Sequence, residues 1–465
     1  MVSPNLESAY KLMHEGSLAL ADVERAGMRV DTDVLKRTKA EVTQRIRKLE
    51  IELQEDEVWK LWRRRYGASA SLGSRVQLGT VLFDDMGHEP QSRTKTARAK
   101  VDEVALNGID IPFIRTYLCY EKLKKLLATY LKGVEREVVD GFIHPVFNLH
   151  LVRTYRSSSD SPNFQNQPVR DKEIGELIRS CFVPRDGHAI VEIDYGSLEV
   201  RIAACYHHDP TMLAYIRDPS KDMHRDMAAE CYKLEAGQVT KEARFAAKNQ
   251  FVFPEFYGSY FAQCAPQLWA SAMLPDVRTV DGESMKSHLA SEGLKKLGTM
   301  PKKGSPPRGT FLHHIMKVEN RFWGKRFHVY DQWRKDWWES YQETGKISLL
   351  TGFEIVGPMK RNDCINYPVQ GAAFHCLLWS LIQMNKELQQ RKMKTVIVGQ
   401  VHDSLVADVH LDELDIYMEL AREIMTERIV EHWPWIIVPL EVEAEIGYEN
   451  WWQKKPIEIG VGNVG

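Results

Sequence analysis

Two largely apolar runs, far apart in the chain, each lead to an aspartate. The run Ile190–Ile193 ends at Asp194, and the run Val396–Val401 leads through a histidine to Asp403. Short apolar runs are typical of buried strands, so each aspartate is expected at the open end of a strand. Two carboxylates that converge there could hold a pair of magnesium ions, which is one way to stabilise the attacking and the leaving oxygen of a phosphoryl transfer.

Each aspartate also has a simpler explanation. Asp194 could cap a following helix, and Asp403 could occupy the tip of a hairpin. Between them, however, Arg244 and Lys248 are four residues apart, on one face of an expected helix, and aromatic residues follow up to Tyr257. Cations suit phosphates and rings suit a nucleobase. Paired carboxylates together with such a helix favour a nucleotidyl transferase.

Composition limits the class of protein. With 465 residues the chain is expected to form several subdomains, and its 43% hydrophobic and 27% charged residues are typical of a soluble globular protein. The net charge is −2, so any contact with nucleic acid must come from local basic patches. Seven cysteines without a C-x-x-C pair favour a reducing compartment. No apolar run approaches the roughly 20 residues of a membrane span, so a cytoplasmic protein without membrane contact is expected.

Periodicity gives a coarse secondary structure. Residues 32–64 are predicted to form one long amphipathic helix, and residues 143–170 an irregular polar segment suited to phosphates and groove acceptors. Residues 261–313 carry little pattern. A helix is expected at 411–428, and alternating apolar and acidic residues predict a strand at 440–446. The fold class is therefore α+β, with a sheet assembled from distant segments.

At the level of motifs the chain resembles family A DNA polymerases, the bacterial DNA polymerase I type. The segments that carry the resemblance are, in chain order, Thr154–Asn166, Asp194–Arg201, Arg244–Gly258, Asn366–Gly371 and Gln400–Asp403. The similarity runs from about Glu24 to Trp451, and five motifs in one order are specific.

The resemblance implies a right-hand polymerase with an antiparallel palm sheet, a helical thumb and helical fingers. The expected parts are a palm entry segment at 1–30, the thumb at 31–150, palm with the first motif at 151–215, fingers with an insertion near 261–313 at 216–365, and palm with the third motif at 366–465. The implied reaction is extension of a primer 3′-hydroxyl with dNTPs on a DNA template.

The resemblance also implies roles for individual residues. Two magnesium ions would be bound by Asp194, Asp403 and the carbonyl of Tyr195, and Lys248 would assist catalysis near the α-phosphate. The incoming nucleotide would be contacted by His224, Arg244, Lys248, Phe253, Tyr257 and Glu199, the last excluding a ribose 2′-hydroxyl. Primer-template DNA would be contacted by Lys125, Arg156, Asn163, Gln165, Asn366, Gln370 and His402.

Several positions depart from the pattern of the family. The third motif often has a second carboxylate where this chain has Ser404, and the first motif usually has glutamine where this chain has Ser197. One extra residue separates Lys248 from Tyr257. Counting back from Tyr257 places Phe253 under the incoming sugar, whereas counting forward from Lys248 gives Val252. This segment resembles a viral branch of the family.

Two other functions are compatible with part of the pattern. A single-subunit RNA polymerase shares the right-hand layout, although Glu199 argues against it. A protein that only binds DNA could have inherited the fold, although both aspartates are present. The polymerase pattern begins near the start of the chain, so no proofreading exonuclease is expected in it, and an exonuclease or replication proteins could be separate partners. The basic segment 300–308 is interpreted as a surface insertion or a DNA contact.

Overall fold

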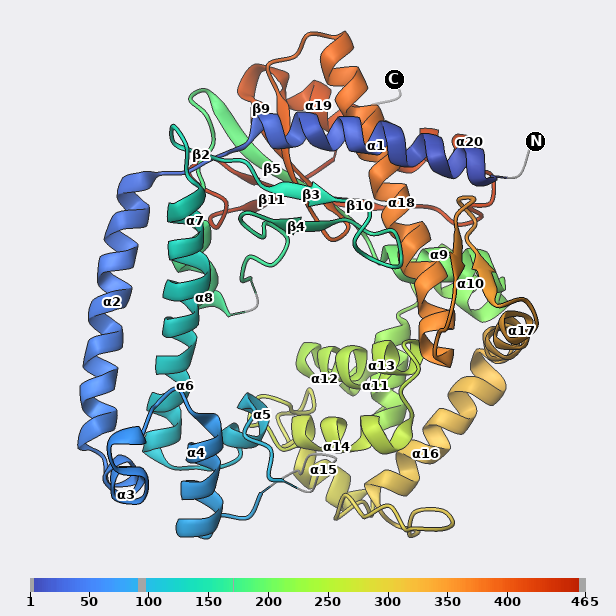
Figure 1. Cartoon of the computed structure of the whole chain (residues 1–465). Coiled ribbons are helices and arrows are strands. Elements are labelled where there is room, and N and C mark those ends of the chain that lie inside the picture. Colours follow the sequence, from blue (N-terminus) through green and yellow to red (C-terminus); the bar gives the residue numbers. More distant parts are fainter. Residues whose placement is uncertain (1–3, 91–97, 170, 460–465) are drawn as a thin grey trace.

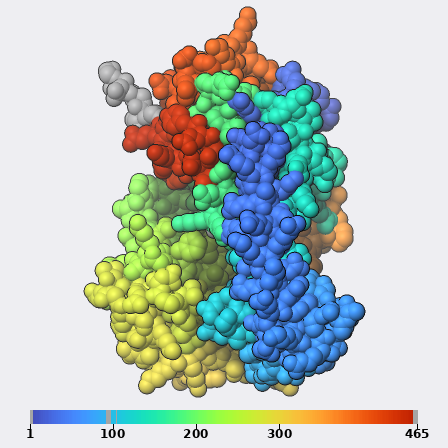
Figure 2. Space-filling model, turned by 90° about the vertical axis from the view of Figure 1, so that its left-hand side faces the viewer, coloured from blue at the N-terminus to red at the C-terminus, as the bar shows by residue number. Residues whose placement is uncertain are grey.

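The structure, a computed structural model, describes residues 4–90, 98–169 and 171–459. Figure 1 shows a sheet at the top of the molecule and two helical arms that descend on either side of it. The space-filling view in Figure 2 shows a hollow between the arm in blue and the arm in green and yellow. We refer below to the sheet region as the palm, to the arm built from residues 31–150 as the thumb, and to the arm built from residues 208–345 as the fingers.

The palm is built on a five-stranded antiparallel sheet. Its order is β11–β10–β5–β9–β8, so that strands from the middle and the end of the chain lie side by side. The strands are β5 (His188–Tyr195), β8 (Val396–Val401), β9 (Ser404–His410), β10 (Val442–Gly447) and β11 (Lys455–Ile457). The central strands β5 and β9 are buried along most of their length, which explains their near-continuous apolar sequences.

Helices cover this sheet. They are α1 (Leu6–Ala26), α9 (Leu198–His207), α18 (Arg361–Gln390), α19 (Leu414–Arg422) and α20 (Ile429–His432). The long helix α18 contacts α1 and α9, and it is apolar on most of its circumference because it crosses the middle of the core. The palm core thus joins the start of the chain to its last hundred residues.

The thumb consists of two long helical columns that lead to a small tip. Its elements are α2 (Thr32–Glu55), α3 (Glu57–Tyr66), α4 (Arg75–Thr80), α5 (Glu103–Asn107), α6 (Pro112–Lys125), α7 (Lys132–Glu137) and β2 (Phe142–Ile143), which pairs with β1 (Met28–Arg29) just before the thumb. The prediction of one helix over 32–64 is wrong. Asp56 ends α2 with extended backbone, and its carboxylate caps α3 by accepting a hydrogen bond from the Val58 N–H at 2.8 Å.

Between the thumb and strand β5 lie short elements that lead into the palm. They are β3 (Val146–Asn148), β4 (Ser158–Asp160) and α8 (Lys172–Arg179), with β3 and β4 paired antiparallel. Around this pair, residues 149–157 and 161–169 are irregular, as their polar sequence indicates.

The fingers are almost entirely helical. They contain α10 (Pro210–Arg217), α11 (Met223–Tyr232), α12 (Lys241–Ala247), α13 (Phe253–Phe256), α14 (Phe261–Ala272), α15 (Met285–Ser291), α16 (Phe311–Arg321) and α17 (His328–Thr344). A short pair, β6 (Lys346–Ser348) and β7 (Glu354–Val356), returns the chain to the palm. The weakly patterned stretch 261–313 therefore holds α14, α15 and the first residues of α16, and residues 273–284 and 292–310 connect these helices.

The predicted α+β class with an antiparallel sheet is confirmed. The described residues form three apolar clusters, one in the palm and the base of the thumb, one in the thumb tip and one in the fingers. The exact boundaries between the parts stay a prediction. Within the described ranges, no helix is both long and apolar enough to cross a lipid bilayer.

Candidate active site

The sheet brings the two aspartates of the sequence prediction together. Asp194 lies one residue before the end of β5 and faces Ser404 across the β5–β9 ladder. Asp403 lies in the two-residue turn between β8 and β9, next to Ser404. The Tyr195 N–H donates a hydrogen bond to the Asp403 carbonyl oxygen at 3.3 Å. Backbone register therefore fixes the carboxylate-bearing segments against each other, although they are distant in sequence.

The two carboxylates repel each other. Desolvation, followed by the charges of Asp403 and Glu192, raises the pKa of Asp194 to about 7. Desolvation and then Glu199 raise the pKa of Asp403 above its ordinary value. Two basic groups that act on these carboxylates are paired with other acids, Arg156 with Glu199 and Lys454 with Glu192, and His402 also acts on Asp403. The result is a crowded pair of acids at a strand edge, and oxygen ligands of this kind suit a hard divalent cation.

A glutamine that the site prediction omitted supports the turn. The Gln400 side chain accepts hydrogen bonds from Ser157 and from Gln165, both at 2.6 Å, and donates one to the His402 carbonyl oxygen at 2.5 Å. His402 has φ of 54°, which is uncommon for a residue other than glycine. The motif Gln400–Asp403 was part of the sequence signal, but nothing in it showed that Gln400 ties the turn to the polar segment before β5.

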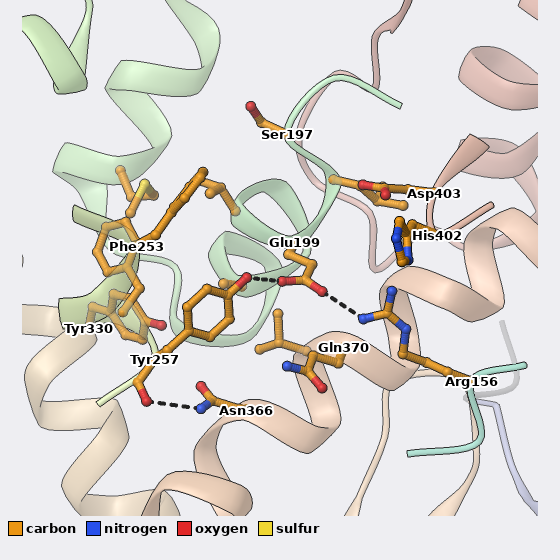
Figure 3. A pocket seen from close by; sticks show the side chains of 16 residues that line it. Arg156, Ser197, Glu199, Phe253, Tyr257, Tyr330, Asn366, Gln370, His402 and Asp403 are labelled. Carbon is orange, nitrogen blue, oxygen red and sulfur yellow. Dashed lines mark hydrogen bonds and ion pairs between the residues drawn. The ribbon is translucent and has the colours of Figure 1, made fainter. Parts of the chain in front are cut away.

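Beside the turn lies a cavity of about 300 Å³ between the palm and the fingers. A chain of polar contacts crosses it, as Figure 3 shows: Arg156 pairs with one oxygen of Glu199 at 3.1 Å, and the Tyr257 hydroxyl donates to the other. Glu199 comes from the first turn of α9, whereas Tyr257 ends α13. Glu199 and Tyr257, which are predicted nucleotide contacts, and Arg156, a predicted DNA contact, therefore line the same cavity.

Helix α18 closes one side of this cavity. Asn366 and Gln370, one helical turn apart, both line it, and the Asn366 side-chain amide donates to the Tyr257 carbonyl oxygen at 3.1 Å. His402 and Asp403 line the cavity from the opposite side. Met212 and Tyr330 also line it and were not predicted, because an apolar residue in the middle of a helical sequence carries no sign of such a position.

The predicted phosphate-binding residues form a second group on the fingers. Arg244 on α12 pairs through Nε with Asp222 at 2.6 Å, and the ring of His224 packs edge-on against Phe253 at 5.6 Å. The Lys248 ammonium lies 5.2 Å from the centre of the Phe253 ring. Burial, and then the charges of Arg244 and Lys248, lower the pKa of His224 to about 4, so its imidazole is neutral at pH 7.

A π-helical turn accommodates the extra residue of this segment. Residues Lys248–Val252 are wound as a π-helix between α12 and α13. Such a turn holds one more residue than an α-helical turn and lets the flanking faces keep their directions. Phe253 consequently lines the cavity, whereas Val252 is fully buried in the fingers core. The structure thus agrees with the count back from Tyr257, because Phe253 lies beside Tyr257 with ring centres 6.4 Å apart.

The remaining predicted DNA contacts are not among the residues that line this cavity. Gln165 belongs to the group around Gln400, and its amide also donates to the Ser157 hydroxyl at 2.7 Å. Asn163 is exposed and accepts a hydrogen bond from the backbone of Asn166. Lys125 is exposed at the C-terminal end of α6 in the thumb.

Comparison with known proteins agrees with this geometry. The model of DNA polymerase family A matches residues 32–272 and 355–453, which is well over half of the chain. The chain belongs to DNA polymerase family A. The match includes both aspartates, the π-helical segment and α18, and it leaves out residues 1–31, 273–354 and 454–465.

Curated relatives are bacterial and viral. The chain is 29% identical over 450 residues to the thermostable DNA polymerase I of Thermus filiformis, which covers 94% of this chain and 47% of that protein. It is 27% identical to DNA polymerase I of Caldicellulosiruptor bescii, with 94% and 46% coverage. It is 25% identical to a DNA polymerase of Bacillus phage SP01, with 82% and 40% coverage. The chain thus spans about half the length of these relatives.

A solved structure shares the fold. The POL domain of Pol1 from M. smegmatis, in complex with DNA primer-template and dNTP, superposes with a TM-score of 0.73 at 24% identity. The match covers 95% of this chain and 70% of that one. At this level of identity the likeness supports the right-hand architecture, and the roles of individual residues depend on the geometry described above.

Proposed function

We propose that the chain is a DNA-templated DNA polymerase that extends a primer 3′-hydroxyl with dNTPs and releases pyrophosphate. The observation that carries this proposal is the convergence of Asp194 and Asp403 at adjacent strand ends, beside a cavity bordered by the nucleotide-binding helix of the fingers. Membership of DNA polymerase family A supports it.

In the proposed reaction the primer 3′-oxygen forms a bond to the α-phosphorus, the bond from this phosphorus to the bridging oxygen breaks, and the hydroxyl proton passes to solvent. Asp194 and Asp403, with the Tyr195 carbonyl, would hold two magnesium ions, whose charge stabilises both the attacking and the leaving oxygen. The fit rests on two crowded carboxylates whose neighbouring cations are paired elsewhere.

The fingers residues would hold the triphosphate. Arg244 and neutral His224 would donate to the outer phosphates, and Lys248 would neutralise charge near the α-phosphate and protonate the departing pyrophosphate. Phe253 would lie under the sugar, and Tyr257 would stack at the templating position. Positioning by these groups accounts for much of the expected rate.

The DNA contacts are proposed on the same basis. Arg156, Asn163, Gln165 and Gln370 would contact minor-groove acceptors, which occur in every correct base pair, while Asn366 and His402 would lie near the nascent pair and the primer terminus. Lys125 would touch the duplex backbone from the thumb.

A primer-extension assay with dNTPs and rNTPs tests the proposal and its main alternative. Wild-type protein should extend a DNA primer with dNTPs in magnesium and use rNTPs poorly. In Glu199→Ala the rates of extension with dNTPs and with rNTPs should be closer to each other, because the side chain that would exclude a ribose 2′-hydroxyl is removed. Preference of the wild type for rNTPs would favour an RNA polymerase, and no extension with either would leave a protein that only binds DNA.

We also propose a bacterial or virus-infected host cytoplasm as the location. All seven cysteines are free, which suits a reducing compartment. Exonuclease or replication proteins are possible separate partners.

A further inference from the structure

The third motif of this chain has one carboxylate where the family often has two, and the structure shows what stands beside the serine that replaces the second. Ser404 is 3% exposed at the start of β9. Its hydroxyl has one proton and two acceptors within reach, the Val401 carbonyl oxygen at 2.9 Å and Oε1 of Glu192 at 3.2 Å. The carboxylate of Glu192 on β5 therefore contacts Ser404, the position at which this chain lacks the second carboxylate.

Glu192 is placed by the sheet to serve this position. It lies two residues before Asp194 on β5, so both side chains project from the same face of the strand. In the register of β5 with β9, Asp194 faces Ser404, and Glu192 faces the residue two further along. The contact between Glu192 and Ser404 is thus a diagonal cross-strand pair, a distance that a long side chain spans.

The other oxygen of Glu192 is fixed by the end of the chain. Oε2 accepts a hydrogen bond from the Trp451 indole N–H at 2.9 Å and pairs with Lys454. Trp451 is fully buried, with the guanidinium of Arg179 4.1 Å from the centre of its ring. Lys454 also pairs with Glu445, which faces Glu192 from β10. With Oε2 held on this side, Oε1 is directed to Ser404.

We propose that Glu192 supplies from strand β5 the acidic group that the third motif lacks, and that it acts through Ser404 as a positioning residue for the turn that carries Asp403. The inference rests on the proposed function, because the turn matters only if Asp403 holds a catalytic cation. It also accounts for the serine: a carboxylate at position 404 would lie against both Asp194 and Glu192, where like charges repel.

The test compares metal binding in wild type, Glu192→Gln and Ser404→Ala. Mn²⁺ binding to the complex with a dideoxy-terminated primer-template is followed by electron paramagnetic resonance, so the readout does not need turnover. The magnesium concentration for half-maximal extension is a second readout. Glu192→Gln should weaken both by about tenfold or more, which is typical for loss of a partner of a metal ligand. Ser404→Ala should weaken both by about threefold, since it removes the contact and leaves the charge.

Relocation of the carboxylate is the decisive step. The double variant Glu192→Gln/Ser404→Glu should recover Mn²⁺ binding to within about threefold of wild type, which a merely structural role of Glu192 does not predict. The matched control is Glu445→Gln, which removes a carboxylate bound to the same Lys454 but not in contact with Ser404. It should leave both readouts within about twofold of wild type.

Unchanged Mn²⁺ binding in Glu192→Gln, or a double variant no better than Glu192→Gln alone, would overturn the inference. If Glu192→Gln does not fold, as judged by thermal melting, wild-type Mn²⁺ binding in Ser404→Ala would overturn it equally. Failure of the proposed function is a separate result, since it would show as absence of primer extension by the wild type.

Discussion

The palm and the fingers position their functional groups in different ways. In the palm, Asp194 and Asp403 are placed by strand register and by a backbone hydrogen bond, so their positions follow from the sheet. In the fingers, Arg244, His224 and Lys248 are held by side-chain contacts and by a π-helical turn that accommodates an extra residue. The family match includes the palm motifs in its two segments, 32–272 and 355–453, and omits residues 273–354, most of which belong to the fingers. The proposed metal ligands are thus placed by the backbone of the sheet, whereas the proposed phosphate contacts depend on side-chain packing.

The largest expected effect is in the palm. Asp403→Ala should reduce primer extension by about a thousandfold or more, equivalent to roughly 4 kcal/mol of transition-state stabilisation, while binding of primer-template stays within about threefold. The reason is that a cation ligand is lost and no large contact surface is changed. Single-turnover extension and a fluorescence binding titration measure the two quantities. Asp412→Asn, an exposed acid at the other end of β9, is the control and should match wild type.

Removal of a proposed phosphate contact in the fingers should reduce activity less than removal of a proposed metal ligand in the palm. Arg244→Ala should raise the KM for dNTP by about tenfold to a hundredfold, because one charge-assisted contact to phosphate contributes roughly 1.5 to 3 kcal/mol. Steady-state kinetics with varied dNTP checks this. Arg321→Ala is the control, since Arg321 is also a fingers arginine paired with an acid, Glu230. An equal change in both variants would show that Arg244 acts through the fold.

A buried acid in the fingers, Glu255, is expected to make the stability of the protein depend on pH. Glu255 is fully buried on α13, accepts a hydrogen bond from the Trp323 indole N–H at 2.9 Å, and has its pKa raised to about 8, first by burial and then by Glu319. Between its unfolded pKa near 4.5 and the folded value, the native state binds more protons, so stability falls as pH rises through this range.

Glu255→Gln removes this dependence. The melting temperature of the variant should be about 3 °C above that of wild type at pH 8. At pH 4 the two should differ by less than about 1 °C, because this pH lies below the pKa of Glu255 in both the folded and the unfolded state. Thermal melting by circular dichroism at the two pH values is the measurement. A variant that is less stable than wild type at pH 8 would contradict the assignment of a neutral, buried carboxyl group.

The smallest effect is expected in the part of the fingers outside the family match. Lys302, Lys303 and Arg308 are exposed in a stretch, residues 293–318, that has no acidic residue. Changing the three to glutamine should leave extension at low salt within about twofold. If all three side chains contact DNA phosphates, the slope of log affinity against log salt should decrease in magnitude by about 3. Glutamines at Lys11 on α1, Lys386 on α18 and Lys392 just after α18, which are exposed and outside the fingers, provide the control. An unchanged slope would indicate a surface insertion.

The sequence is sufficient to predict the fold class and the meeting of the two aspartate-bearing segments. Asp194 and Asp403 are predicted at the ends of strands because the short apolar runs before them, Ile190–Ile193 and Val396–Val401, are typical of buried strands. The break at Asp56 was missed, since amphipathic spacing continues from α2 into α3 while a single capping carboxylate separates them. Local patterns of this kind cannot show where one helix ends and a similar one begins.

Other features depend on three-dimensional register. The π-helical turn at Lys248–Val252 accounts for an extra residue that counting alone could not assign. The contact of Glu192 with Ser404 and the hydrogen bonds of Gln400 join positions more than two hundred residues apart. No local pattern encodes such diagonal and long-range contacts, because they follow from how strands pair.

In the proposed active site, Asp194 and Asp403 share a divalent cation. Anomalous diffraction of Mn²⁺ tests this in crystals of the protein with a dideoxy-terminated primer-template and a dNTP. We expect a Mn²⁺ peak within about 2.5 Å of carboxylate oxygens of both residues. Mn²⁺ bound by only one of them, or at a different part of the molecule, would contradict it.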